Sequence, residues 1–456
     1  MIAGSRDQGE NPKMEASIQL AAPNDIDNGC TSALETSMME KLDKLFAMSP
    51  SRCIYRVPHR LRSVCEKAYT PQVVSIGPLH HGKETLKAME EQKWRYLRCF
   101  IRRNNLSLKD CIKIVRDQET RLRSCYSEAI ELQSDELISI ILVDAVFIIE
   151  FLLRYSYLEL RNENDCIFGT PKMIDDVWPD LVMLENQLPF FILEHLFGLN
   201  TFLAPSEDTD TLDFGRLSIL HLCHQFLNQD VRRIGGTLDN LKAVSEEEVQ
   251  HLVDFFRKLY IAPLFKPQSA GQPKQVTAPS IEELHRAGVK FKFRSTKNLF
   301  DIRFKDGILE IPKLEISDST ELILRNLIAF EQCIWKGNYI SDYVGIMDQF
   351  VNTPKDVELL VHYGIVEHML GGGNDELCTM INSLTTEVKI YPTKFYYGTV
   401  CEDLNKFCSL LWHKRMANLR HNYFNTPWKT ISFIAAVFLL IFTAVQTICS
   451  IISLKP

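Results

Sequence analysis

The chain has 456 residues and a net charge of -7, with 24% charged and 46% hydrophobic residues. A chain of this length can bury one large core or two ordinary ones, so two or three domains are expected. The small net charge excludes a global field that would concentrate polyanions on the protein, and we expect no nucleic acid among its partners.

The first 33 residues are polar, almost free of aromatic side chains, and interrupted by Pro12, Pro23 and Gly29. Such a segment cannot bury enough apolar surface to fold, so residues 1–33 are predicted to be a disordered lead. They also lack the apolar stretch of a signal peptide. Apolar residues at helical spacing between 38 and 46 then predict a short amphipathic helix.

From residue 86 to 199 the apolar positions predict helices. The most apolar run, Leu137–Leu153, contains Asp144 and Glu150. Each carboxylate would cost about 3 kcal/mol near a bilayer centre, so this run is predicted to be a core helix rather than a membrane span. A spacing of six puts the two carboxylates on different faces, and we expect each to have its own local partner.

Residues 201–214 and 262–280 are rich in Pro, Ser, Thr, Gln and Gly, as linkers or long loops are. They are candidate internal boundaries of a globular region that we place at residues 34–426. No internal repeat is evident.

Between Val289 and Ile316, apolar and polar residues alternate as they do in strands. Asp306-Gly307 within this region is a typical hairpin turn sequence. Helical spacing then resumes, and Ser319 or Thr320 is expected to cap the next helix. The predicted fold class is therefore mainly α (α+β), with a small antiparallel β region near 289–316.

The C-terminal segment 427–456 is predicted to be a transmembrane anchor. Residues 430–454 carry no charge, and as a helix they would span about 37 Å, more than the roughly 30 Å of a hydrocarbon core. Four basic residues precede the span and one follows it, which favours a cytosolic globular region. We expect a single-pass protein of the plasma membrane that contacts lipid through residues 430–454. The basic residues are Lys414, Arg415, Arg420 and Lys429 before the span, and Lys455 after it.

Small or hydroxylated residues form one stripe of this helix. Such a stripe would let two copies associate closely in lipid, assisted by Gln446. Alternatively, the hydroxyls bond back to carbonyls of their own helix and the span is a simple tether. The stripe consists of Ser432, Ala436, Thr443, Thr447 and Ser450.

The thirteen cysteines are scattered and never form a CxxC pair. This pattern indicates free thiols in a reducing compartment. The single glycosylation sequon, Asn105-Leu106-Ser107, falls in a stretch predicted to be helical rather than in a loop, which also favours the cytosol.

Several segments resemble a known plant family. They are CIYRVPHRLR (53–62), the stretch 68–97 containing SIGPLHHGKETL, MLENQLPFFILE (183–194), AGVKFKF, LEIPKLEI, TELILRNLIAFEQC, and YFNTPWKTIS before the apolar tail. In this order, over roughly residues 52–450, they resemble the family of domain of unknown function 247, also catalogued as an uncharacterised protein family. The resemblance implies a membrane-associated land-plant protein without an established activity. It also implies a recognition role, because some members are implicated in pollen–stigma self-incompatibility.

The motif Gly77-Pro78-Leu79-His80-His81-Gly82-Lys83 has the spacing of a phosphate-binding loop and follows the strand-like Val73–Ile76. However, Glu84 replaces the Ser or Thr that would bind magnesium, and Pro78 removes a cradling N–H. We therefore predict no nucleotide site here.

Other candidate residues have ordinary structural interpretations. His80 with His81, and His221 with His224, lack further ligands at metal-binding spacing. Arg95, Arg98 and Arg102 lie on one helix face and could bind RNA or acidic lipid, or could form a solvated basic face. Glu185, Asn186 and Gln187, before Pro189, are expected to cap backbone groups between two helices.

The sequence therefore assigns no catalytic, cofactor-binding or metal residue. The leading hypothesis is a non-enzymatic recognition or signalling scaffold on a membrane, acting through contacts with protein partners. The alternative is an enzyme of unrecognised type whose site is assembled from distant residues. A large exposed apolar patch would favour the scaffold, whereas a deep polar pocket with several shifted carboxylates or histidines would favour the enzyme.

Overall fold

The computed structural model of the chain describes residues 34–39, 42, 51–162, 165–200, 219–227, 241, 244, 245, 247–261, 276–296, 298–334, 337–410 and 427–453. The chain divides into two units, residues 1–50 and 51–456, and each is described by itself. In the first unit, residues 34–39 are helical and overlap the start of the helix predicted between 38 and 46, most of which lies outside the described residues. The predicted disordered lead, residues 1–33, lies outside the described residues.

The first half of the second unit is built around α6 (Ser134–Ser156). This helix buries every side chain from Leu137 to Arg154 except that of Ser139. It packs against α3 (Lys87–Arg103), α4 (Leu108–Asp117) and α8 (Phe190–Phe197). The prediction of a core helix is thus confirmed. The other helices of this half are α2 (His59–Arg62), α5 (Glu119–Cys125), α7 (Met173–Leu181) and α11 (Leu252–Tyr260), with short 3₁₀ turns η1 (Glu66–Tyr69), η2 (Glu84–Leu86) and η3 (Leu158–Leu160).

The β region contains the predicted hairpin. Strands β2 (Arg303–Lys305) and β3 (Ile308–Pro312) pair in antiparallel fashion. Asp306 and Gly307 have φ of 52° and 76°, the conformation that a tight hairpin turn requires.

The remaining strand pairs differ from the antiparallel prediction. Strand β1 (Lys290–Arg294) pairs with β3 in parallel, and β4 (Leu314–Ile316) pairs in parallel with the distant β5 (Val366–His368). The segment between β1 and β2 is long enough to bring β1 alongside β3 from the other side, and alternation does not encode strand direction.

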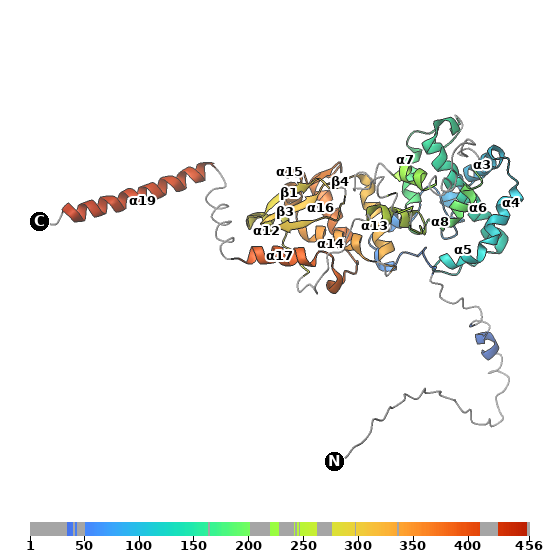
Figure 1. The fold of residues 1–456 in the computed structure, drawn as a ribbon, viewed down its shortest axis with the longest axis horizontal. Coiled ribbons are helices and arrows are strands. Elements are labelled where there is room, and N and C mark those ends of the chain that lie inside the picture. Colours follow the sequence, from blue (N-terminus) through green and yellow to red (C-terminus); the bar gives the residue numbers. More distant parts are fainter. Residues whose placement is uncertain are drawn as a thin grey trace, which may run out of the picture. The chain divides into compact units, whose positions relative to one another are not determined.

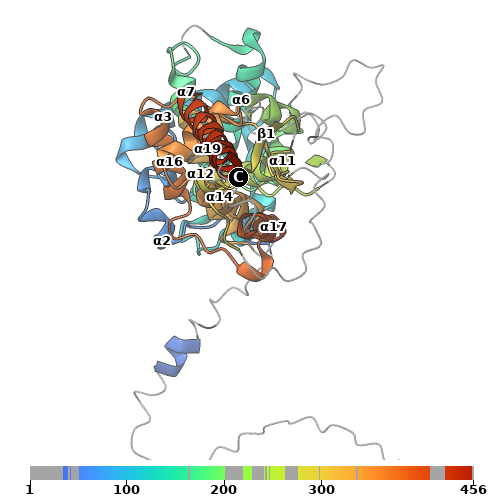
Figure 2. The same cartoon turned by 90° about the vertical axis from the view of Figure 1, so that its left-hand side faces the viewer.

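Helix α13 (Asp318–Glu331) links the two halves of the second unit. It contacts α11 and η1 from the first half and α14 (Tyr339–Phe350) and α16 (Gly373–Leu384) from the second, and Figures 1 and 2 show α14 and α16 together near the sheet. Its N-cap is Ser317, not the predicted Ser319 or Thr320, because Thr320 completes a capping box as the third helical residue. The other helices here are α12 (Ile281–Arg286), α15 (Pro354–His362), η4 (Pro392–Lys394) and α17 (Gly398–Ser409).

One continuous cluster of buried apolar side chains runs from Cys53 to Leu404. The candidate boundaries near 201–214 and 262–280 lie largely outside the described residues and stay predictions.

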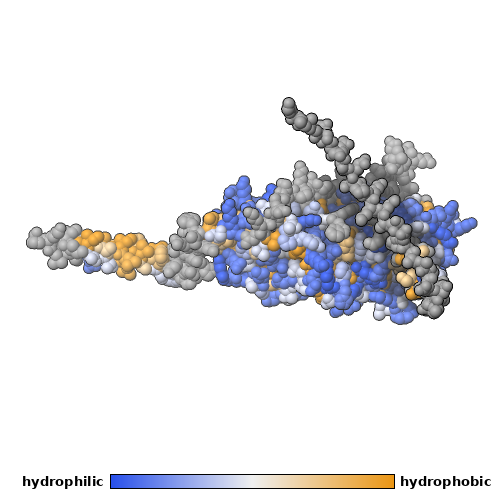
Figure 3. All heavy atoms as spheres, turned by 90° about the horizontal axis from the view of Figure 1, so that it is seen from below, coloured by the Kyte–Doolittle hydropathy of each residue, from blue (hydrophilic) through white to orange (hydrophobic). Residues whose placement is uncertain are grey.

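Helix α19 (Pro427–Ser453) has the properties expected of the predicted anchor. Within it, Ile431–Ile448 is long and apolar enough to cross a membrane, and none of this stretch is buried against the rest of the protein. In Figure 3 the visible face of this stretch is mostly hydrophobic, with a few polar residues along it. Length and composition alone support a span here, and the helix is the only such stretch among the described residues.

Candidate functional site

The motif at residues 77–83 does not form a phosphate-binding loop. The N–H of Gly77, which would face a phosphate, instead donates to Asp144 Oδ2 at 2.8 Å. The preceding Val73–Ile76 is not the strand that the sequence suggests. It is an extended segment whose Val73 and Val74 N–H groups donate to Asp180 at 2.7 and 2.8 Å. A carboxylate occupies the position that an anionic ligand would need.

The two buried carboxylates of α6, Asp144 and Glu150, have separate partners, as predicted. Asp144 forms an ion pair of 2.7 Å with Lys93. Glu150 accepts from Arg103 and from Arg154, the latter at 3.2 Å. These contacts hold α6 to α3, so both carboxylates are structural.

Glu185, Asn186 and Gln187 form hydrogen bonds with backbone groups, as predicted. Glu185 also forms ion pairs. Asn186 bonds the Ile76 N–H and the Val74 carbonyl, and Gln187 donates to the Leu181 and Met183 carbonyls. Helix α8 then begins directly after Pro189.

Glu185 is fully buried and anchors a charged cluster that sequence reasoning missed. Its carboxylate lies 2.5 Å from Arg62 and 3.3 Å from both Arg56 and His80. It also accepts from the Val57 N–H at 2.6 Å. Burial alone would raise the pKa of Glu185, but these contacts outweigh it and lower the pKa to about 2. Burial lowers the pKa of His80, so its imidazole is neutral. The cluster fixes α2 against the loop before α8.

The two histidine pairs do not assemble. His80 and His224 are buried, whereas His81 and His221 are exposed. Within the described residues, no three His, Cys, Asp or Glu side chains come close enough to hold a metal ion.

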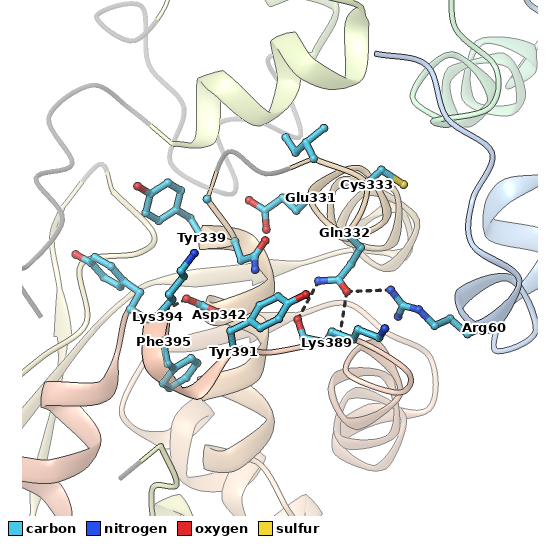
Figure 4. A pocket seen from close by; sticks show the side chains of 14 residues that line it. Arg60, Glu331, Gln332, Cys333, Tyr339, Asp342, Lys389, Tyr391, Lys394 and Phe395 are labelled. Atoms are coloured by element: carbon cyan, nitrogen blue, oxygen red, sulfur yellow. Dashed lines mark hydrogen bonds between the residues drawn. The ribbon is translucent and has the colours of Figure 1, made fainter. Parts of the chain in front are cut away.

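The strongest candidate site is a pocket of about 540 Å³ that the sequence did not indicate (Figure 4). Its volume lies within the range of small-ligand pockets. Three segments form it: the end of α13, the start of α14, and residues 389–396, with Arg60 of α2 at one side. The lining residues are Arg60, Glu331, Gln332, Cys333, Ile334, Gly337, Asn338, Tyr339, Asp342, Lys389, Tyr391, Lys394, Phe395 and Tyr396.

Glu331 fixes the wall between α13 and α14. Its carboxylate accepts from the N–H groups of Ile340 (3.2 Å) and Ser341 (2.9 Å) in the first turn of α14. Arg257 compensates the charge, with Nε 3.2 Å away. Burial raises the pKa of Glu331, and Arg257 opposes the rise. This carboxylate serves as a helix cap and has little capacity left for a ligand.

Gln332 fixes the opposite wall (Figure 4). Its Oε1 accepts from Arg60 Nη2 at 3.1 Å and from the Lys389 N–H at 3.0 Å, while its Nε2 donates to the Lys389 carbonyl at 3.1 Å. Arg60 also donates to the Glu387 carbonyl. A single amide therefore holds residues from α2, α13 and the 389–396 segment together.

Asp342 is a titratable group of this pocket with a strongly raised pKa. It accepts from the Tyr396 N–H at 2.9 Å and is only 4% exposed. Burial raises its pKa to about 7, although the hydrogen bond opposes the rise. The carboxyl is therefore divided between its neutral and charged forms near neutral pH.

The rim carries cations and tyrosines. Lys389, Lys394 and Tyr391 are exposed, and neither lysine forms an ion pair with a residue that the structure describes. Tyr339 and Tyr396 meet edge to face with ring centroids 6.1 Å apart. Gly337 lies under the Tyr339 ring, where a Cβ would come within 2.5 Å of Cε2.

Cys333 is a poor candidate nucleophile. Burial raises the pKa of its thiol to about 11, so almost no thiolate forms at neutral pH. The pocket thus offers two rim cations, aromatic rings and one protonatable carboxyl, which suit binding better than covalent chemistry. The only sequence signal was the polar Glu331-Gln332-Cys333 at the end of an apolar helix, and both partners of Gln332, Arg60 and Lys389, lie more than 50 residues away in the chain.

The match of this chain to a protein family covers the pocket, the charged cluster and most of α19. The family is described as "Plant protein of unknown function", and its profile matches residues 54–442. The chain belongs to this family, domain of unknown function 247. The resemblance stated from the sequence motifs is confirmed.

Two Arabidopsis thaliana proteins of uncharacterised family UPF0481 are similar to this DUF247 chain. One is 26% identical over 429 residues, covering 88% of this chain and 87% of the relative. The other, described as putative, is 23% identical over 484 residues, covering 86% and 89%. No solved structure matches. The family therefore supplies no assigned activity.

Proposed function

We propose that this DUF247 protein is a membrane-tethered recognition protein whose globular region binds partners without transforming them. The single observation that supports tethering is α19, which exposes an uncharged apolar surface along Ile431–Ile448. An exposed apolar helix of this length is stabilised by lipid. The basic residues before it favour a cytosolic globular region.

The 540 Å³ pocket supports recognition rather than catalysis. Its buried polar groups already have protein partners: Glu331 caps α14, and Gln332 bridges Arg60 and Lys389. These bonds make a preformed site, which lowers the entropic cost of binding. Lys389 and Lys394 give the rim a positive charge, so the favoured partner is an acidic protein segment that inserts one carboxylate side chain.

The tether can be tested by fractionating plant membranes. The full chain should stay in the pellet after alkaline carbonate extraction, and a chain ending at residue 426 should be released.

The orientation of the chain in the membrane can be tested by glycosylation at Asn105. Contrary to the helical prediction, it lies in an exposed turn between α3 and α4 with φ of 51°. A cytosolic region leaves this sequon unmodified, and glycosylation there would contradict the proposed orientation.

Recognition can be tested by proximity labelling with the full chain. Reversing the rim charge with Lys389→Glu and Lys394→Glu should remove a defined subset of labelled proteins. Lys109→Glu with Lys113→Glu, on exposed positions of α4, introduces the same charge change away from the pocket. Loss of the same proteins in both variants, or in neither, would exclude the pocket as the recognition surface.

A second candidate function is an enzyme that uses Asp342. A carboxyl with a pKa of about 7 is suited to general acid–base catalysis at neutral pH. This reading requires a substrate whose conversion by the full chain is abolished by Asp342→Asn. Under the recognition proposal, the same variant retains the labelled partners.

A further inference from the structure

A second hollow lies on the outer face of α3, far along the chain from the segments that form the first pocket. It has a volume of about 250 Å³. Arg95, Arg98 and Arg102 line it from α3, and Arg154 of α6 joins them. The spacing of three and four residues places the α3 arginines on one helix face, as the sequence indicates. We call these four residues and the hollow between them the arginine pocket.

The inner side of the arginine pocket is rigid and already neutralised. The side chain of Arg154 is only 6% exposed and pairs with Glu150 at 3.2 Å and Asp165 at 3.4 Å. Its guanidinium also lies over the Tyr96 ring, 4.5 Å from the centroid. Asp165 in turn accepts from the Tyr96 hydroxyl at 2.8 Å. These contacts hold one guanidinium at the base of the hollow without adding net charge.

The outer side carries positive charge that the described residues leave largely uncompensated. Arg98 and Arg102 are exposed and form no ion pair or side-chain hydrogen bond with any residue that the structure describes. Arg95 pairs with Glu91 at 2.6 Å, but both side chains are more than half exposed, so a competing anion can replace this pair at little cost. The pocket therefore presents three guanidiniums that a ligand can engage.

This arrangement favours phosphate over other anions. A guanidinium donates two parallel N–H groups that match two phosphate oxygens, and several such forks around one hollow suit a ligand with several phosphates. At about 30 Å³ per water, the hollow holds roughly eight water molecules, which is room for more than one phosphate.

Nucleic acid fits the site less well than a small phosphorylated ligand. Sequence-tolerant binding of single strands requires exposed aromatic rings on which bases stack. Trp94 is 51% exposed but does not line the hollow, and the aromatic residues between these arginines, Tyr96 and Phe100, are buried at 1% and 0% exposure. They form the core side of α3 and cannot stack on bases.

We propose that the arginine pocket binds a small ligand or head group that carries at least two phosphates. The same chemistry occurs in soluble inositol polyphosphates and in the head groups of phosphoinositide lipids. The site would therefore sense a soluble phosphate signal or select a membrane by its lipid.

The full chain in nanodiscs of neutral phosphatidylcholine can be titrated with inositol hexakisphosphate in a calorimeter at 0.15 M salt. Saturable binding is expected. Arg98→Glu with Arg102→Glu should weaken it at least about tenfold, because two charge-assisted contacts are lost. Arg98→Lys with Arg102→Lys keeps the charge but removes the paired donors, and should weaken binding by a smaller factor.

Lys109→Glu with Lys113→Glu is the matched control, since it makes the same charge change on α4 and should leave the affinity within about twofold. Melting curves of all variants identify any that fail to fold, and the lysine double variant then provides the readout. Absence of saturable binding by the wild type, or equal weakening by the control, would overturn the proposal.

Two further arms identify the source of the phosphates. Recruitment of added phosphatidylinositol bisphosphate vesicles to the nanodiscs, lost in the glutamate double variant, would support a lipid head group. Binding of inositol hexakisphosphate without vesicle recruitment would support a soluble ligand. Tighter binding of a 20-nucleotide RNA, with the same sensitivity to Arg98 and Arg102, would overturn the small-ligand assignment.

Discussion

Lys93 and Asp144 form a buried ion pair of 2.7 Å between α3 and α6, with side chains 0% and 2% exposed. Lys93 also donates to the Ser75 carbonyl and to Glu90, and Asp144 accepts from the Gly77 N–H. Burial raises the pKa of Asp144, and the nearby ammonium opposes that rise. One pair of charges thus holds two helices and the loop at residues 75–77 together.

Replacing Lys93 by Met should lower the free energy of unfolding by about 3 to 5 kcal/mol, because it leaves a carboxylate buried without its cation. Lys87→Met is the control, since Lys87 pairs with Glu84 at the surface and should change stability by no more than about 0.5 kcal/mol. Urea unfolding followed by circular dichroism measures both. Equal losses in the two variants would contradict a special role for the buried pair.

Gly77→Ala should be more destabilising than Gly82→Ala. Both glycines have a left-handed backbone, with φ of 72° and 79°. A Cβ at Gly77 would lie 2.8 Å from the Gln187 carbonyl oxygen, whereas a Cβ at Gly82 meets nothing within 4 Å. Both variants incur the left-handed strain, and Gly77→Ala should lose about 1 to 3 kcal/mol more from overpacking. Similar unfolding midpoints would show that the loop moves away from Gln187.

Glu185 should make the fold sensitive to acid. Its pKa is about 2 in the folded protein against an ordinary 4.5, so its stabilisation is complete above pH 4.5 and is lost as the pH falls toward 2. The shift corresponds to about 3 kcal/mol. Glu185→Gln should remove this pH dependence, which unfolding curves at pH 7 and pH 3 can measure.

Glu128→Gln is the matched control for this prediction, because Glu128 also pairs with Arg56 but has a side chain 48% exposed. It should preserve the acid sensitivity. If Glu185→Gln kept the wild-type slope between pH 4.5 and pH 2, other carboxylates would have to account for it.

Asp342 should have the opposite effect. Its pKa is about 7 in the fold against an ordinary 3.8, so stability is lost as the pH rises from 3.8 through 7. Asp342→Asn removes the charge and retains an acceptor for the Tyr396 N–H. The melting temperature of the variant relative to wild type should therefore rise between pH 5 and pH 8. A difference that stays constant across this range would show that Asp342 is ionised throughout.

The stripe of small residues on α19 is expected to be a simple tether surface. Thr443 and Thr447 donate to the Leu439 and Thr443 carbonyls of their own helix, both at 2.7 Å. A membrane self-association reporter fused to residues 414–456 should give equal signals for the wild type and for Ala436→Leu with Thr443→Leu. A marked loss of signal in the double variant, with insertion intact, would instead support packing of two copies along the stripe.

The sequence by itself determined those elements whose type follows from local composition and backbone chemistry. The uncharged run Ile431–Ile448 of α19 is long and apolar enough to span a membrane, and a run as apolar as Leu137–Leu153 with two carboxylates needs a protein core, as α6 shows. The hairpin at Asp306-Gly307 followed from local backbone chemistry. Family membership also followed from ordered motifs along the chain.

Only the tertiary structure decided what those elements bring together. Spacing within a segment cannot show that Gln332 meets Lys389, that Glu185 meets Arg62, or that β4 pairs with β5. Nor can it show that Arg154 closes a hollow formed by Arg98 and Arg102. Periodicity reports which face of an element is buried, whereas a site depends on contacts between residues far apart in the chain, and these are fixed by the packing of the whole core.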